Sequence, residues 1–314
     1  MTGVIEQAVR RPGADGAMWR EDAVVDATAR DMWELFEPLH DLVYFAPEAR
    51  QAADGLGMRG YWMGYFALRA APLGPVSPSV VTSSFYVFHP ARVARALPDA
   101  WSHASPAQVL AARAEAVDAA MTRLFGAETA RSERFAEAAD LAWEAAAAAD
   151  TNGRVLAAAN QALERPGRAA ARLWQAVTTL REHRGDGHVA VLVSLGIGPL
   201  EAMVLKAAAG ESDGSFLRET RKWEQEDWTV AERALRERGF LDAHGALTRA
   251  GAAGRALVER RTDEAAGRPW HALGAERTAR LAALLDPLAR AVRESGLLPP
   301  GNPVGLPPRE PAAR

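Results

Sequence analysis

The sequence predicts a mainly α-helical fold made of two similar units in tandem, with additional packing helices. Apolar residues recur at helical spacing along most of the 314-residue chain. Segments also repeat: "MWELFEPLH" at Trp33 resembles "LWQAVTTLREH" at Trp174, 141 residues later, and "FGAETAR" at Gly126 resembles "LGAERTAR" at Gly274, 148 residues later. An offset that drifts slightly is what a tandem duplication leaves. Chance matching in an alanine-rich chain is the alternative.

The first unit is expected over residues 23–150. "ATARDMWELFEPLHDLVYF" predicts a helix whose apolar stripe holds Met32, Leu35, Phe36 and Leu39. "SPAQVLAARAEAVDAAMTRLF" predicts a helix with Ser105 as its N-cap and Pro106 in its first turn. "ERFAEAADLAWEAAAAAD" is a further amphipathic helix.

The second unit is expected over residues 169–295. Three helical segments, "GPLEAMVLKAAAG", "SDGSFLRETRKW" and "EQEDWTVAERALRERGF", precede "FLDAHGALT", which predicts two short strands around a turn. A helix capped by Thr248 follows, and "ERTARLAALLDPLARAV" predicts a last helix bent at Pro287. Three helices, a hairpin and a helix form a winged helix-turn-helix. Segment 151–168 is predicted as a linker, 1–22 as a flexible N-terminus and 296–314 as a proline-rich tail.

Part of the second unit resembles MarR-like regulators. "ALRERGFLDAHGALTRAGAAGRALVE" is similar to their third helix and wing, and it includes "LTxxG" as Leu247, Thr248 and Gly251. Through "FEPLH", "YFAPEA", "RAAPLGPV" and "REHRGDGHVA" the whole chain resembles an actinobacterial helix-turn-helix family without an agreed activity. If both units are winged helices, one chain reproduces the two-fold dimer of such regulators as an intramolecular pseudo-dimer. The resemblance to MarR-like proteins implies small-molecule clefts between the dimer helices and the wings.

Composition excludes several classes of function. The chain has no cysteine, so disulfides, thiolate metal sites and cysteine nucleophiles are absent. Its formal net charge of −3 gives no global electrostatic case for nucleic acid or an anionic membrane. No apolar run approaches the ~20 residues of a membrane span. We therefore expect no membrane partner and a cytoplasmic location, with oligomerisation left open.

The candidate recognition helix, 223–238, is a poor match to DNA. It holds five acidic residues and three arginines, and three of the acids fall in the turn that would enter the groove. Phosphate contacts need positive or neutral donors. DNA therefore stays an alternative partner, disfavoured by this acidic helix.

"LREHRGDGHVAVL" is a first candidate site. His183 and His188 are five residues apart, and glycines at 185 and 187 are expected to break the helix, so the two imidazoles could converge across a turn. Asp186 could orient either ring, and Arg181 and Arg184 could hold a carboxylate or phosphate. The alternative is that His183 and Arg184 cap a helix end.

A second candidate is a polar stripe in the first unit. Glu37, His40, Asp41 and Tyr44 have the i, i+3, i+4, i+7 spacing of one helix face, and His40 or Tyr44 could serve acid–base chemistry. A satisfied core histidine is the alternative.

The third candidate is "GYWMGYFALRAAPLGPV". Tyr61, Trp62, Tyr65 and Arg69 predict an aromatic-walled pocket with one cation, suited to a planar organic acid; the alternative is ordinary core.

Together these features predict a small-organic-molecule-binding protein on a repurposed winged-helix scaffold. The ligand is expected to be aromatic or acidic. An acid–base enzyme and a resistance protein of specialised metabolism both fit, and whether the protein is an enzyme stays open. His40, Tyr44, His183 and His188 are the catalytic candidates, with no cofactor and no metal indicated, since no complete glycine-rich loop or metal-ligand spacing occurs. A ligand-responsive DNA-binding regulator is the alternative.

Overall fold

The computed structural model describes residues 18–299, with side chains from Thr28 onward. Within this range the regular elements are helices joined by loops, with one isolated β-bridge and no strand. The principal elements of the first half are α1 (Met18–His40), α2 (Leu42–Phe45), α3 (Pro47–Gly55), α4 (Gly60–Ala70), η2 (Ala71–Leu73), α5 (Pro78–Phe85), α6 (Pro90–Ala96), α7 (Ala100–His103), α8 (Pro106–Phe125), α9 (Ala127–Ala130) and α10 (Glu133–Ala147). Those of the second half are α11 (Val155–Gln161), α12 (Ala169–Ser194), α13 (Pro199–Ala208), α14 (Gly214–Arg221), α15 (Gln225–Glu237), α16 (Arg249–Ala265), α17 (Arg268–Leu273) and α18 (Ala275–Glu294).

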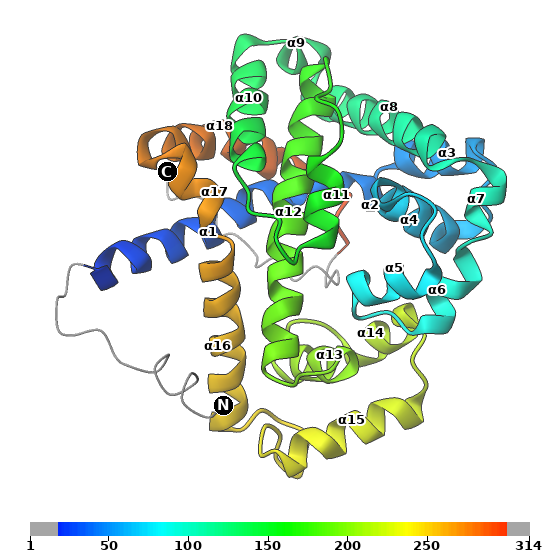
Figure 1. Cartoon of the computed structure of the whole chain (residues 1–314), viewed down its shortest axis with the longest axis vertical. Helices are drawn as coiled ribbons and strands as arrows, with labels where there is room; N and C mark the ends of the chain where they lie inside the picture. Colours follow the sequence, from blue (N-terminus) through cyan, green and yellow to red (C-terminus); the bar gives the residue numbers. More distant parts are fainter. Residues whose placement is uncertain (1–17, 300–314) are drawn as a thin grey trace, which may run out of the picture.

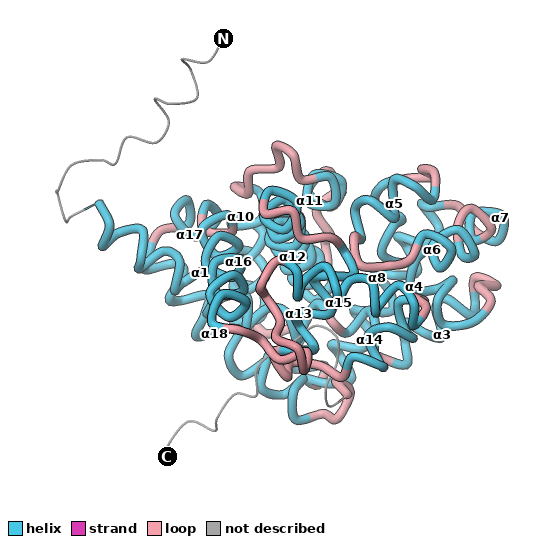
Figure 2. The backbone as a smooth tube through the Cα atoms, turned by 90° about the horizontal axis from the view of Figure 1, so that it is seen from below, coloured by secondary structure: helices cyan, strands magenta, loops and turns pink. Residues whose placement is uncertain are grey.

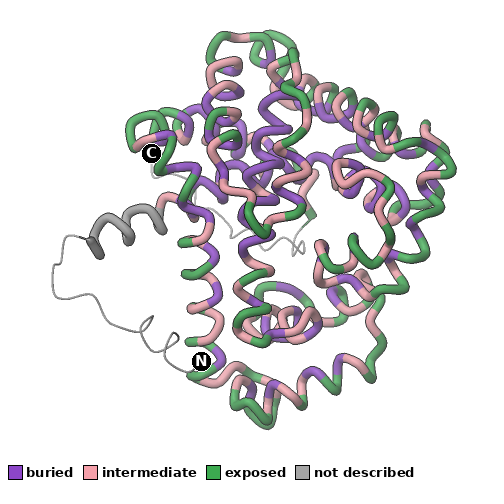
Figure 3. The backbone as a smooth tube through the Cα atoms, in the orientation of Figure 1, coloured by how far each residue is buried: buried purple, intermediate pink, exposed green. Residues whose placement is uncertain are grey.

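Helix α12 forms the centre of the molecule (Figure 1). It packs against α1, α8, α10, α11 and α16. Its first turns are buried on every side, as the continuous purple of this segment shows (Figure 3). A helix enclosed all round is apolar or internally paired on every face, and the polar side chains of α12 must therefore find partners inside the protein.

The prediction that Gly185 and Gly187 break this helix is wrong, because α12 continues through both. A glycine inside a helix costs about 1 kcal/mol relative to alanine, and packing outweighs that cost here. A Cβ on Gly187 would lie 2.6 Å from Nη1 of Arg154 and 3.3 Å from Cβ of Ala265. Gly187 thus allows Arg154 and the end of α16 to approach the helix.

Two hydrophobic cores stabilise the chain. The larger one joins α1, α3, α4, α8, α10, α12 and α18 and contains the fully buried side chains Phe36, Phe66, Phe88 and Trp174. The smaller one joins the end of α12 to α13, α14, α15 and α16, around Leu217, Trp228 and Leu235. The second core lies in the segment predicted as a winged helix-turn-helix, α13 to α16, in the lower part of Figure 1.

The predicted caps are confirmed at two helix starts. Ser105 accepts a hydrogen bond from the Gln108 backbone while the Gln108 side chain accepts one from the Ser105 backbone, which is a capping box. Thr248 accepts from the Gly251 backbone at 3.0 Å and begins α16. The predicted hairpin is reduced to one bridge between Leu241 and Leu247, so the wing is shorter than expected.

Gly251, the glycine of "LTxxG", has a steric role. A Cβ at this position would lie 2.1 Å from the Phe240 carbonyl oxygen, which belongs to the backbone and cannot swing aside. We expect Gly251→Ala to lower the free energy of unfolding by about 1–3 kcal/mol. In urea titrations, the matched control is Gly254→Ala. A Cβ there meets only the Phe240 ring at 3.7 Å, and we expect a gain of up to about 1 kcal/mol. Equal effects of the two substitutions would contradict this role.

The long helices α1 and α12 each pack on helices of the other predicted unit. α1 packs on α16 and α18, and α12 packs on α8 and α10. Gly126, before α9, and Gly274, before α18, also share one backbone conformation, with φ and ψ of 82° and 148° against 84° and 155°. The duplication and the boundaries 23–150 and 169–295 stay predictions, which this arrangement suits. Segment 151–168 contains α11, which packs on α12.

The two halves also touch near the helix-turn-helix. The backbone N–H of His89 donates to the Arg221 carbonyl at 3.0 Å, and the Trp223 indole donates to the Val87 carbonyl at 2.9 Å. Arg92 donates to the Glu219 carbonyl at 2.9 Å. The first turn of α6 is therefore docked on the end of α14; Figure 2 shows α6 and α14 on the same side of the molecule as α4.

Most of the predicted flexible N-terminus, 1–22, and of the proline-rich tail, 296–314, lies outside the described residues. Between residues 18 and 299 no single helix is long and apolar enough to cross a membrane. The consecutive helices α12 and α13, bent by 98° at their junction, meet that test of length and composition only as a pair.

Candidate functional site

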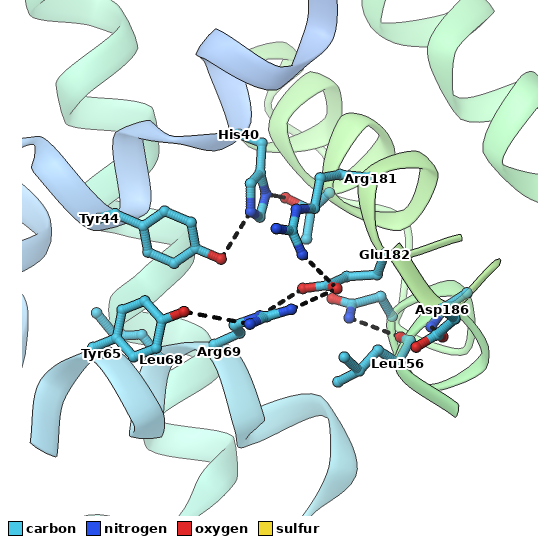
Figure 4. A network of polar contacts seen from close by, with 12 residues as sticks. His40, Tyr44, Tyr65, Leu68, Arg69, Leu156, Arg181, Glu182 and Asp186 are labelled. Atoms are coloured by element: carbon cyan, nitrogen blue, oxygen red, sulfur yellow. Dashed lines mark hydrogen bonds and ion pairs between the residues drawn. The ribbon is translucent and has the colours of Figure 1, made fainter. Parts of the chain in front are cut away.

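A buried polar network lies where α1, α2, α4 and α12 meet (Figure 4). Its members are charged or aromatic side chains that sit inside the larger core: Glu37, His40, Asp41, Tyr44, Tyr65, Arg69, Thr178, Arg181 and Glu182. Burying ionised groups costs several kcal/mol for each unless they are paired. Such a concentration of titratable groups is typical of functional sites.

His40 is held by two hydrogen bonds. Its Nδ1 lies 3.0 Å from the Thr178 hydroxyl, and its Nε2 lies 2.9 Å from the Tyr44 hydroxyl. The ring stacks on Trp174 with centroids 6.0 Å apart. Burial, reinforced by the positive charge of Arg181, lowers the pKa of His40 well below its usual value. His40 is therefore a neutral imidazole with both ring nitrogens within hydrogen-bond distance of hydroxyl groups.

Arg69 is neutralised inside the protein rather than free. Its Nε and Nη2 donate to the two oxygens of Glu182 at 2.9 and 3.0 Å, and its Nη1 donates to the Tyr65 hydroxyl at 3.3 Å. Burial by itself would raise the pKa of Glu182, but the guanidinium groups of Arg69 and Arg181 hold it well below its usual range. This bidentate ion pair fixes α4 against α12.

The stripe of α1 supplies a second ion pair and an isolated carboxyl group. Arg181 donates to Glu37 at 3.2 Å and to Glu182 at 2.9 Å, and the Trp33 indole donates to Glu37 at 3.0 Å. Asp41 is fully buried, and neither of its side-chain oxygens has a hydrogen-bond partner within the described protein. Burial, together with the charge of Glu37, raises the pKa of Asp41 well above its usual value.

Arg113 is a member of the site that the sequence analysis missed. It is 3% exposed, and its guanidinium donates to the Leu68 carbonyl at 2.9 Å and to Oε1 of Gln175 at 3.0 Å. It lies over the Trp174 ring, 5.0 Å from its centroid. Burial lowers the pKa of Arg113 to about 10, which leaves it charged at neutral pH.

Two small cavities adjoin the network. The first has a free volume of about 10 Å³, the room of roughly one water molecule, and Arg113, Arg69, Glu182 and His40 are among the residues that line it. The second has about 20 Å³ and is lined by aromatic and small residues, including Tyr61, Tyr65 and Gly64. Val43, Tyr44 and Leu68 line both cavities and form the wall between them.

The predicted aromatic residues of α4 separate into two groups. Tyr61, which is 42% exposed, and Tyr65 line the second cavity, and Tyr65 lies 5.1 Å from Tyr44 between ring centroids. Trp62 instead packs against Phe88, with centroids 5.8 Å apart, and beneath the guanidinium of Arg92. Trp62 thus supports the aromatic cluster from outside the cavities.

The residues predicted from "LREHRGDGHVAVL" do not converge with His40. His183 is buried with no hydrogen-bond partner at Nε2, and His188 contacts the Thr262 hydroxyl at 3.0 Å. Arg184 pairs with Asp263 at 2.6 Å, and Asp186 accepts from the Ala157 backbone at 2.9 Å. Burial lowers the pKa of both histidines to about 4 and raises that of Asp186 to about 6. Residues 28–299 contain no group of three His, Asp or Glu side chains that could hold a metal.

One signal in the sequence could have found Arg113. It lies four residues after Val109 and four before Val117, both of which are fully buried, so it occupies the apolar stripe of α8. An arginine on a stripe of core residues needs a polar partner inside the protein. The sequence indicates the burial of Glu182 less clearly, because its neighbours Arg181 and His183 are also polar and the three together resemble a solvent-exposed segment.

The outward surface of α15 carries little positive charge. Its exposed residues are Gln225, Glu226, Thr229, Val230, Arg233 and Glu237. Two of the acids counted against DNA binding are engaged within the helix. Asp227 accepts from the Glu224 backbone, and Glu232 accepts from both Trp228 and Arg236. The surface that remains has one arginine and two glutamates.

Comparison with known proteins gives one match. A family model described as a helix-turn-helix family matches residues 29–299, which is most of the chain. No curated protein and no solved structure matches it.

Proposed function

The chain belongs to this helix-turn-helix family, and we propose that it binds a small organic ligand in its core, beside His40, Arg69 and Arg113. The observation that carries the proposal is the buried polar network around the two cavities at the junction of α1, α4, α8 and α12. A fold stabilised by apolar packing alone does not need these ionised groups, and each of them costs stability. Ligand recognition gives them a purpose.

The same geometry serves binding and acid–base chemistry. His40 is neutral and hydrogen-bonded to the Tyr44 hydroxyl, which faces the first cavity. This pair can move a proton to or from a ligand placed there. The same site therefore suits either an enzyme or a binding or resistance protein of specialised metabolism. A measurement of turnover distinguishes these two functions. His183 and His188 lie outside the network, which favours His40 and Tyr44 as the proton-transfer residues.

A second candidate function is DNA binding, which the helix-turn-helix family favours. Two features weigh against DNA recognition by a MarR-like pair of winged helices. The exposed surface of α15 has more acid than base. The contacts of His89 and Arg92 with α14 also hold α6 against the other unit. Paired recognition helices must instead reach half-sites about 34–36 Å apart.

The ligand proposal is tested by comparing native with denaturing mass spectrometry of the freshly purified protein. We expect a non-covalent mass excess in the native spectrum that disappears on denaturation, and its loss in His40→Ala. His244→Ala is the matched control, because His244 is exposed in the wing. Circular dichroism verifies that both variants fold. Retention of the excess in a folded His40→Ala protein would contradict this location.

The DNA alternative is tested by titration with mixed-sequence duplex DNA at several salt concentrations. If the protein binds DNA through phosphates, the logarithm of the association constant falls linearly with the logarithm of the salt concentration. The slope is proportional to the number of phosphates contacted. We expect no such slope at physiological salt. A steep slope that is reduced by Arg233→Ala would support a regulator and displace the ligand proposal as the main function.

A further inference from the structure

The polar network contains more positive than negative charge. Three guanidinium groups, those of Arg69, Arg113 and Arg181, lie in it. Glu182 and Glu37 pair with Arg69 and Arg181. Burial raises the pKa of Asp41 and of Glu37 and lowers that of His40, so each of these groups favours its neutral form. Even with both glutamates ionised and paired, the third guanidinium has no carboxylate of the described residues within ion-pair distance.

The excess charge belongs to Arg113. No carboxylate among residues 28–299 lies within ion-pair distance of its guanidinium, and its two hydrogen bonds go to neutral acceptors. The second of these acceptors is held in place, because the Gln175 amide donates to the backbone and side-chain oxygens of Asn160 at 3.2 Å. A guanidinium has five N–H donors. Arg113 is therefore a fixed, buried cation that borders a cavity and lacks a counterion.

The adjoining cavity is lined mainly by apolar and aromatic side chains and has a free volume of about 20 Å³. It shares Val43, Tyr44 and Leu68 with the first cavity, and it extends to Tyr61, which is partly exposed. Its other walls are aromatic or small except for Arg50, which pairs with Asp54 at 2.9 Å. Gly64 is required there, since a Cβ would lie 2.8 Å from that of Ala53. The two cavities have only about 10 and 20 Å³, so an aromatic ligand enters only when side chains such as Tyr44, which lines both cavities, move aside and join them.

We infer that the ligand is an organic carboxylate whose anionic group binds Arg113 and whose apolar body lies between Tyr44, Tyr61 and Tyr65. This inference rests on the proposed function. The planar fork of an arginine matches the two oxygens of a carboxylate, and a carboxylate supplies the missing negative charge. Arg69 is not the receptor, because Glu182 already occupies it.

The experiment compares three probes by calorimetric titration: benzoate, its neutral analogue benzamide, and formate, which has the charge without the ring. The proteins are wild type, Arg113→Met, Arg113→Lys and the control Arg95→Met, whose arginine is exposed. We expect benzoate to bind wild type more tightly than either other probe. Arg113→Met should weaken the affinity for benzoate by at least about tenfold and leave the affinity for benzamide unchanged. The benzoate affinity of Arg113→Lys should fall between those of wild type and Arg113→Met, and that of Arg95→Met should match wild type.

Ala49→Val tests the apolar part of the site independently of Arg113. The larger side chain narrows the second cavity. We expect it to weaken the affinity for benzoate and to leave the affinity for formate unchanged. If Arg113→Met does not fold, this variant and the comparison of benzoate with benzamide in wild type still decide the matter. Equal affinity for benzoate and benzamide, unchanged benzoate affinity in Arg113→Met, or no binding of any probe would overturn the inference. A mass excess in the native spectrum alongside such a result would leave the proposed function standing with a neutral ligand.

Discussion

Glu182→Gln is expected to lower the free energy of unfolding by about 3–5 kcal/mol. Glu182 is 1% exposed and accepts hydrogen bonds from two arginines, Arg69 and Arg181. Glutamine has nearly the same shape but no charge, so Arg69 loses the one carboxylate that pairs with it among residues 28–299. Equilibrium unfolding in urea measures the loss, and no other single substitution in the network is expected to cost more.

Two further variants separate this cause from general disruption. Glu137→Gln removes a carboxylate from an exposed pair with Arg280, and we expect no measurable change, because surface ion pairs contribute little. The double variant Glu182→Leu with Arg69→Met replaces the buried pair with apolar groups and should recover much of the lost stability. A double variant as unstable as Glu182→Gln would show that the stranded charge is not the cause.

Acidification is expected to destabilise the protein partly through His183. Burial lowers its pKa to about 4, against about 6.5 in an unfolded chain. A group whose pKa is depressed by folding in this way binds its proton preferentially in the unfolded state. Its contribution to stability is complete above pH 6.5 and is lost as the pH falls to about 4, at a cost of about 3 kcal/mol. The structural cause is that protonated Nε2 would have no acceptor.

The measurement is a comparison of wild type with His183→Gln in urea at neutral pH and near pH 4. The difference in unfolding free energy between the two proteins should shrink on acidification. The comparison with a variant is needed because Asp186 acts in the opposite direction: its pKa is raised to about 6, so its contribution is complete below about pH 4 and is lost as the pH rises. His244→Gln is the control, and an unchanged difference for His183→Gln would refute the assignment.

The helices and their caps could be predicted because their signals are local. Ser105 and Thr248 are polar residues at the start of apolar periodicity, and the structure uses both as caps. Glycine is a local signal too, yet it misled at 185 and 187. The reason is that the benefit of Gly187 comes from Arg154 and Ala265, which are far from it in the sequence.

The candidate site could be predicted only in part, for the same reason. Spacing brought His40 and Tyr44 together, since they are four residues apart, and the structure joins them by a hydrogen bond. The partners of His40 and Arg69 on α12, Thr178 and Glu182, come from more than 100 residues away. No periodicity in the sequence encodes such a pairing. Without knowledge of its partner Glu182, Arg69 looked like a free cation.

The docking of α6 on α14 has a consequence for evolutionary drift. All three acceptors, at Val87, Glu219 and Arg221, are main-chain carbonyls, which every residue type provides. Only the Trp223 indole and the Arg92 guanidinium contribute side-chain atoms to these hydrogen bonds. Substitutions at 87, 219 and 221 therefore keep the three acceptors, and what limits divergence of the two halves is the side-chain packing across their contact, such as Arg221 over the Phe88 ring, 4.5 Å from its centroid.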